Sequence, residues 1–211
     1  MTNFCHNEVT IQSTQTDINK ITEHLKSPKT TMFAETLFDF NNLIPMPKQI
    51  HGINRVETDK KKYYYFQSVW KESLPKDKRE LLENFGKESP LAFPDIEWLE
   101  ENSIDDFTIR RLTAEYGSPF WYDWAIKNWG TKWNAYDAKI CIGPIPNITK
   151  LKDGSQLVYT LVTAWSEPRP VIRALIQYLT PPEFDENLKI KWRFADELEH
   201  FQGEINKNDR V

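Results

Sequence analysis

The sequence contains few of the residues from which most catalytic and metal-binding motifs are built. Only 7 of its 211 residues are glycine, and it has no glycine-rich phosphate loop and no Gly-x-Ser-x-Gly nucleophile turn. None of the histidines stands at metal-ligand spacing from a cysteine or from a second histidine; they are His6, His24, His51 and His200. These absences predict no metal, no cofactor and no catalytic residue of a familiar class.

Long apolar runs and a leader sequence are also missing. No apolar stretch approaches the roughly 20 residues that cross a bilayer, and the first residues lack the basic and then apolar pattern of a signal peptide. We therefore expect a cytoplasmic protein that is not bound to a membrane. Cys5 and Cys141 suit a reducing compartment as free, buried thiols, while a disulfide between them stays an open alternative.

The charge balance gives no general attraction to a polyanion. The net charge is −4 and the pI is about 5.7, so binding of nucleic acid would need a local basic patch. Apolar residues make up 39% of the chain and charged residues 27%. This composition is typical of a folded globular protein rather than of a disordered one.

Hydrophobic patterns predict regular structure at both ends of the chain. In order, we expect a strand over 5–13, a helix over 16–26, a helix over 121–129, strands over 136–142 and 157–165, a helix over 169–179, and strands over 188–194 and 201–206. Apart from 121–129, this order is that of a split β-α-β unit. It predicts an α+β fold, the ferredoxin-like sandwich, with one antiparallel sheet and helices on one face.

The middle of the chain has a different character. Residues 60–66 are basic and then aromatic, 75–88 show a charged helical pattern, and 91–107 contain six acidic residues and no lysine or arginine. Charge without alternation favours helices over strands. We predict a largely helical insertion over 48–116 that divides the ferredoxin-like domain into 1–47 and 117–211.

Four short segments occur in a distinctive order along the chain. They are Asn3–Ile11 (NFCHNEVTI), Phe40–Pro47 (FNNLIPMP), Asn128–Ala135 (NWGTKWNA) and Thr163–Pro168 (TAWSEP). In these segments the chain resembles the YubB-like proteins of phages and conjugative plasmids, which carry a ferredoxin-like domain of unknown function. The resemblance implies this fold and an origin in a mobile genetic element. It implies no activity, and 48–116 has no part in it.

Tryptophan is concentrated in one short run, and this run is the first candidate site. As a recognition surface it would provide rigid aromatic anchors with polar residues beside them: Trp121, Trp124, Trp129, Lys132, Trp133 and Asn134. The alternative is a buried joint where the insertion packs onto the sheet, because large aromatic side chains are more often core. On the first interpretation the protein is a non-enzymatic accessory protein of a phage, plasmid or integrated element. Its partner would be a host protein, for example a defence component, or another protein of the element.

The turn before the helix at 169–179 allows two interpretations. The helix N-terminus could hold an anion with help from Ser166 and Arg169. The simpler alternative is that Ser166 or Thr163 caps the helix and Trp165 covers the edge of the sheet.

Two further hypotheses concern nucleic acid and catalysis. A single-stranded nucleic acid could stack on aromatic residues of the predicted strands and contact the basic run. The strand aromatics are Tyr136, Tyr159 and Phe194 or Trp192, and the run supplies Lys60, Lys61, Lys62, Tyr63 and Tyr65. The alternative for 60–66 is a solvated loop that leads into a strand. Alternatively, Asp123 and Asp137 could form a general acid and base pair with Arg169 close to them. The sequence leaves the separation of these carboxylates open.

Overall fold

The chain forms two compact units. The computed structural model describes residues 4–27, 36–85, 93–144, 154–180, 182, 184–197 and 202–206. Residues 1–45 and 125–211 form one unit, which we call the sheet unit, and residues 46–124 form the other, the insertion unit. The second boundary lies within helix α6 (Trp121–Trp129), eight residues after the position suggested by the sequence.

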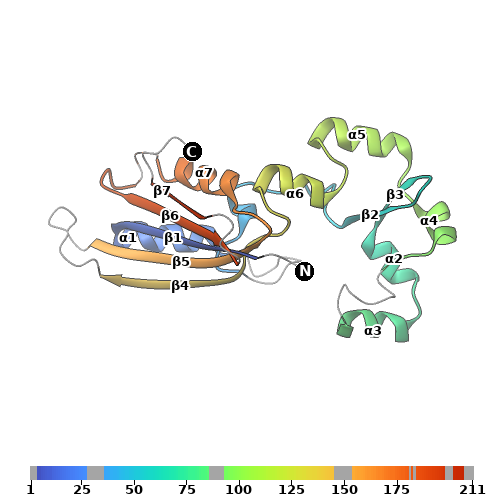
Figure 1. Ribbon diagram of the computed structural model, residues 1–211, viewed down its shortest axis with the longest axis horizontal. Coiled ribbons are helices and arrows are strands. Elements are labelled where there is room, and N and C mark those ends of the chain that lie inside the picture. The colour runs from blue at the N-terminus through green and yellow to red at the C-terminus, as the bar shows by residue number, and fades with distance from the viewer. Residues whose placement is uncertain are drawn as a thin grey trace. The chain divides into compact units, whose positions relative to one another are not determined.

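The sheet unit is built on one antiparallel sheet of five strands (Figure 1). In spatial order the strands are β4 (Tyr136–Pro144), β5 (Gly154–Ala164), β1 (Phe4–Thr14), β6 (Lys189–Asp196) and β7 (Gln202–Asn206). The central strand β1 pairs along its whole length with β5, from Phe4 opposite Ala164 to Thr14 opposite Gly154. The predicted combination of an antiparallel sheet with helices is confirmed.

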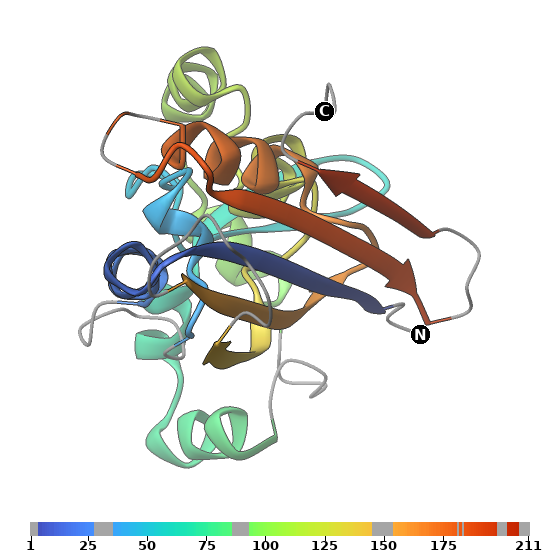
Figure 2. The same cartoon turned by 90° about the vertical axis from the view of Figure 1, so that its left-hand side faces the viewer.

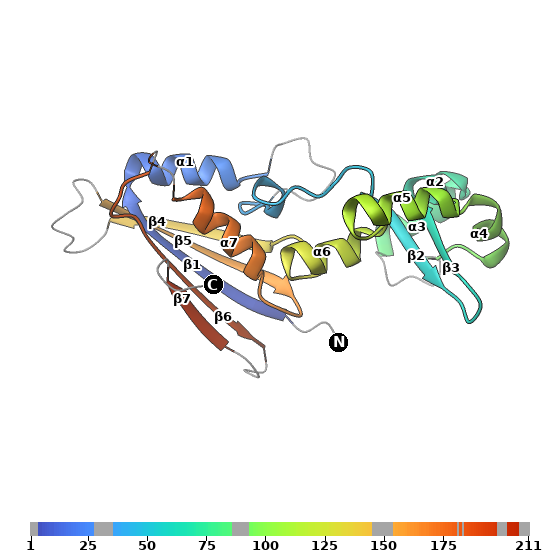
Figure 3. The ribbon, with the colours of Figure 1, turned by 90° about the horizontal axis from the view of Figure 1, so that it is seen from above.

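Helices α1 (Gln15–Leu25) and α7 (Arg169–Tyr178) cover one face of this sheet, as Figure 2 and Figure 3 show. The strands alternate accordingly, since successive side chains point to opposite faces. On β1 the odd-numbered residues from Cys5 to Ser13 are buried against the helices, whereas His6 is exposed on the other face. Each fully buried aliphatic side chain, such as Val9, stabilises the fold by about 1.5–3 kcal/mol.

Helix α1 begins at Gln15, one residue before its predicted start, and polar contacts fix that position. The Thr14 side chain accepts a hydrogen bond from the backbone N–H of Asp17 at 3.2 Å. The buried Asp17 carboxylate accepts two more bonds, from the Ser13 hydroxyl at 2.6 Å and from the Asp185 backbone N–H at 3.1 Å. A cap of this kind stabilises a helix by about 1 kcal/mol.

The insertion unit combines a β-hairpin with short helices. Its elements are β2 (Ile53–Glu57), β3 (Lys62–Phe66), α2 (Gln67–Ser73), α3 (Lys76–Phe85), α4 (Ile96–Asn102) and α5 (Asp106–Tyr116). Its small core consists of Tyr63, Tyr65, Trp70 and Leu99. Four of these six elements are helices, and the basic and aromatic run enters a strand whose alternate side chains form this core.

No helix in the described part of the chain has the length and apolarity needed to cross a membrane. The longest helices, α1 and α5, have 11 residues each, about half of what a bilayer requires.

Candidate functional site

The four short segments singled out in the sequence meet at one end of the sheet unit. The Thr131 hydroxyl donates to the carbonyl of Ala164 at 2.8 Å and accepts from the N–H of the same residue at 3.1 Å. Asn134 donates to the Asp39 carboxylate at 2.7 Å and accepts from the Phe40 N–H at 2.8 Å. We call this end of the unit the motif junction, formed by residues 4–7, 39–44, 129–134 and 163–169.

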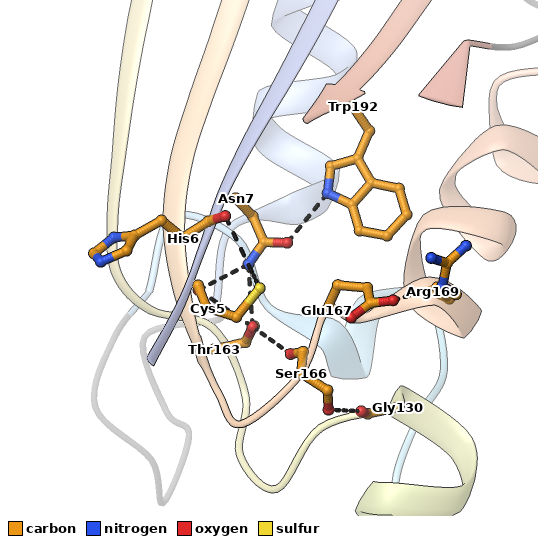
Figure 4. A network of polar contacts seen from close by, with 9 residues as sticks. All are labelled: Cys5, His6, Asn7, Gly130, Thr163, Ser166, Glu167, Arg169 and Trp192. Carbon is orange, nitrogen blue, oxygen red and sulfur yellow. Dashed lines mark hydrogen bonds and ion pairs between the residues drawn. The ribbon is translucent and has the colours of Figure 1, made fainter. Parts of the chain in front are cut away.

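A buried polar network lies beneath the motif junction (Figure 4). The Asn7 amide nitrogen donates to the Thr163 hydroxyl and to the Cys5 carbonyl, both at 3.0 Å. Its amide oxygen accepts from the Trp192 indole N–H at 3.1 Å. Asn7 thus ties three neighbouring strands together, and a satisfied network of this kind rigidifies a core.

Cys5 lies in this network, and its thiol has low reactivity. Its thiol is fully buried, and burial raises its pKa to about 11. A hydrogen bond with Thr163 opposes this rise, and the carboxylates of Glu167 and Asp196 add to it by smaller amounts. The thiolate is the nucleophilic form of cysteine. A thiol that stays protonated at neutral pH gives no support to cysteine catalysis here.

Above the network, the turn between β5 and α7 presents Trp165 to solvent. Trp165 has a φ of 73°, in the left-handed region that side chains other than glycine rarely adopt, and 46% of it is exposed. The Thr163 hydroxyl donates to the Ser166 carbonyl at 2.7 Å, and the Ser166 hydroxyl donates to the Gly130 carbonyl. The surrounding contacts therefore hold the turn in this strained conformation.

Gly130 allows the two chain segments of the junction to approach each other closely. It has a φ of 80°, and a Cβ at this position would lie 2.9 Å from Pro170 Cδ and 3.2 Å from the Glu167 carbonyl oxygen. Only glycine fits both the backbone conformation and the space. The segment after α6 is thereby held directly against the turn that carries Trp165.

A lysine stacks between two tryptophans on this surface. The Lys132 ammonium lies 4.7 Å from the centroid of the Trp133 ring and 5.0 Å from that of the Trp165 ring. Cation–π contacts of this kind contribute about 0.5–1 kcal/mol each at exposed sites. We call Lys132, Trp133 and Trp165 the tryptophan–lysine cluster.

The expected cap of α7 is wrong. The N-cap is Pro168, which offers no side-chain hydrogen bond, because Ser166 and Thr163 bond within the junction instead. Arg169, proposed as an anion ligand, pairs with the Glu167 carboxylate at 2.6 Å. These polar groups therefore stabilise the conformation of the turn.

The predicted tryptophan surface is only partly preserved. Trp124 and Trp129 are buried, with 6% and 2% exposure, so neither presents an anchor to a partner. Trp121 and Trp124 belong to the insertion unit, and the other four residues of that prediction belong to the sheet unit. Asn134 holds the segment at Asp39, as described above. Lys132 and Trp133 remain at the surface, where they are joined by Trp165, which sequence reasoning assigned to the sheet edge.

Three of the tyrosines predicted to stack bases are also buried. Tyr159 has 0% exposure and packs edge-on against Phe38, with ring centroids 5.0 Å apart. Tyr63 and Tyr65 belong to the core of the insertion unit. The stacking role is therefore wrong for all three. Lys60, Lys61 and Lys62 are exposed at the hairpin turn, and Lys62 pairs with Glu57 at 3.1 Å.

The two candidate catalytic carboxylates lie in different units, each beside a cation of its own. Asp123 of the insertion unit pairs with Arg55 at 2.9 Å. Asp137 of the sheet unit pairs with Lys139 at 3.0 Å. Within the described residues, no group of three or more histidine, cysteine or acidic side chains is placed to hold a metal ion.

Comparison with known proteins gives no information on the tryptophan–lysine cluster or on the network below it. The chain matches no protein-family model, no curated protein and no solved structure.

Proposed function

We propose that this protein is a non-enzymatic interaction protein of a mobile genetic element and that the tryptophan–lysine cluster is where its partner protein binds. The observation that carries the proposal is Trp165, a large aromatic side chain that is 46% exposed on a backbone with φ of 73°. Such a conformation costs about 1–2 kcal/mol for a residue other than glycine. Strained residues concentrate where a protein binds or reacts.

The rigidity of the turn supports a role in recognition. Binding energy is reduced by the entropy lost when flexible side chains are ordered, so a side chain fixed beforehand binds at lower cost. Trp165 is held by the Lys132 contact above it and by the Thr163 and Ser166 hydrogen bonds below it. Tryptophan is also the residue most enriched among interface hot spots.

The resemblance to YubB-like proteins supports the origin in a mobile element and a partner in the host. Three of the four motifs that carry this resemblance hold or present the cluster: Asn3–Ile11, Asn128–Ala135 and Thr163–Pro168. Because these three motifs support one surface, we infer that this surface accounts for their presence in the sequence. We propose a host protein, such as a defence component, as the partner.

We also propose that the sheet unit is a ferredoxin-like split β-α-β sandwich. Its chain order of β1, α1, β4, β5, α7 and β6, together with the spatial order β4-β5-β1-β6, supports this topology. Both neighbours of β1 are antiparallel to it. Strand β7 is then an addition at the edge.

The test is affinity purification from nuclease-treated bacterial lysate with three versions of the protein. They are the wild type, Trp165→Ala and the control Phe107→Ala, which removes another exposed aromatic side chain, in the insertion unit. A hot-spot residue contributes about 2 kcal/mol or more, so Trp165→Ala should weaken the partner complex at least about thirtyfold, whereas Phe107→Ala should retain it. Thermal melts should be similar for all three. A protein partner that binds Trp165→Ala as tightly as wild type would refute the assignment.

A further inference from the structure

The face of the sheet opposite the helices contains a hollow. It has a volume of about 780 Å³ and is lined by His6, Glu8, Lys139, Thr160, Val162 and Arg193, among others. The hollow crosses β4, β5, β1 and β6. Its lining includes Asn7 of the buried network but no residue of the tryptophan–lysine cluster.

Basic side chains are regularly spaced along this face. The alternation of β6 places Lys189, Lys191 and Arg193 on it, opposite the buried Ile190, Trp192 and Phe194. Residues two apart on a strand are about 6.8 Å apart, a step similar to that between phosphates of an extended nucleic-acid strand. Lys139 of β4 adds a cation on the opposite wall of the hollow.

Two acidic residues of this face, Glu8 and Asp137, are weak competitors for those cations. Glu8 lies 3.5 Å from Arg193 and Asp137 lies 3.0 Å from Lys139, and the side chains of both pairs are about half exposed. Exposed ion pairs contribute about 0–1 kcal/mol. A chain of phosphates can therefore replace them while the fold stays intact.

The remainder of this face supplies neutral hydrogen-bonding groups and a pair of aromatic rings. Strand register places Thr10 opposite Lys191 and Gln12 opposite Lys189. At the other end of the face, Phe4 and Tyr136 form an edge-to-face pair with centroids 5.6 Å apart, and Tyr136 is 36% exposed. Aromatic rings beside cations are the combination that binds single strands without sequence preference.

We propose that this open face binds single-stranded nucleic acid, with Lys139, Lys189, Lys191 and Arg193 contacting phosphates and Tyr136 stacking on a base. Tyr136 is one of the strand aromatics that the sequence suggested for stacking, whereas the Lys60–Phe66 run and Tyr159, suggested for the same ligand, are not part of this site. Together with the partner surface at the motif junction, it would allow the protein to bring a partner protein to a nucleic acid.

The experiment measures fluorescence anisotropy of labelled dT20 and rU20 with the whole protein at 50 and 200 mM NaCl. Four phosphate contacts predict a slope of log Kd against log salt of about 2.8, which is about fiftyfold weaker binding at the higher salt. Lys189→Gln combined with Lys191→Gln should halve the slope. The matched control, Lys20→Gln with Arg173→Gln, removes two exposed cations from α1 and α7, and it should change nothing.

Three outcomes would overturn the proposal. They are absence of binding at 50 mM salt, an equal loss in the control variant, and a slope that the β6 variant leaves unchanged. Competition separates nucleic acid from other polyanions. If polyglutamate displaced the labelled strand as well as unlabelled dT20 does, the face would be a site for an acidic protein, and the nucleic-acid assignment would be wrong. Tyr136→Ala should weaken binding about tenfold, since stacking on one ring accounts for about 1–3 kcal/mol.

Discussion

Trp129 and Trp165 are parts of the same motif junction, yet they lie in opposite environments. Trp129 is 2% exposed, packs edge-on against Phe40 at 5.7 Å, and donates its indole N–H to the Ile44 carbonyl at 2.8 Å. Trp165 is 46% exposed on a left-handed backbone. The Trp129 ring packs inside the junction, whereas contacts of the junction hold the Trp165 ring at the surface.

The difference shows that residue type and local density do not decide whether a tryptophan is core or contact surface. The dense run from Trp121 to Trp133 contains buried members, whereas Trp165 stands outside it. The backbone conformation decides whether each tryptophan is buried or exposed. Helix α6 directs Trp129 inward, and the turn after β5 leaves Trp165 outside the sheet. Substitutions at both positions can test how far this contrast extends.

The largest effect is expected for Trp129→Ala. The substitution removes a fully packed ring and leaves the Ile44 carbonyl without its donor, so we expect a loss of about 3–5 kcal/mol in the free energy of unfolding. Trp165→Ala, the matched change at the exposed site, should cost less than about 1.5 kcal/mol. Urea denaturation followed by circular dichroism measures both. Equal losses in the free energy of unfolding would show that the two rings do not differ in burial.

The two cysteines also differ in burial, and the expected effect on folding stability is smaller. Cys5 is buried as predicted, but Cys141 is exposed, so the expectation of two buried thiols is wrong for Cys141. Burial raises the pKa of the Cys5 thiol from 9.0 to about 11. Above pH 9 the unfolded chain releases this proton while the folded protein keeps it, so folding stability falls between pH 9 and 11 and is unaffected by this group at lower pH. The loss should be on the order of 2 kcal/mol.

Cys5→Ala provides the measurement for that prediction. The difference in unfolding free energy between wild type and Cys5→Ala cancels the titration of lysines and tyrosines common to both proteins. It should be constant from pH 7 to pH 8.5 and then decrease by about 2 kcal/mol towards pH 11. A difference that stays constant up to pH 11 would mean that Cys5 titrates normally and is not desolvated.

The fold was largely predictable from the sequence because its elements follow simple periodicities. The alternation of β1 and β6 and the apolar stripe of α7 are visible without any structure, since one face of each element is buried. The hairpin of the insertion unit was harder. Its strand β3 consists of consecutive basic and aromatic residues, and the burial of Tyr63 and Tyr65 depends on Trp70 and Leu99 further along the chain.

The candidate site was less predictable, for a physical reason. The motifs that form it were visible, but the exposure of Trp165 depends on its positive φ and on contacts with Gly130 and Lys132, which are more than 30 residues away in sequence. The sequence suggested the sheet face for nucleic acid, but the cations on the open face of the sheet were missed for a related reason. Its cations alternate with core residues on β6, so they look like the ordinary exposed side of a strand until the register places Lys139 across from them.

The smallest effect concerns the backbone strain at Trp165. Replacing glycine by alanine usually stabilises a protein slightly through the unfolded state, but at a positive φ the order is reversed. Trp165→Gly should therefore be more stable than Trp165→Ala by about 1 kcal/mol. Trp133, whose φ is not positive, supplies the control pair: Trp133→Gly should be less stable than Trp133→Ala. If alanine were favoured at both positions, the turn would store no strain, and the main argument for Trp165 as a prearranged anchor would be lost.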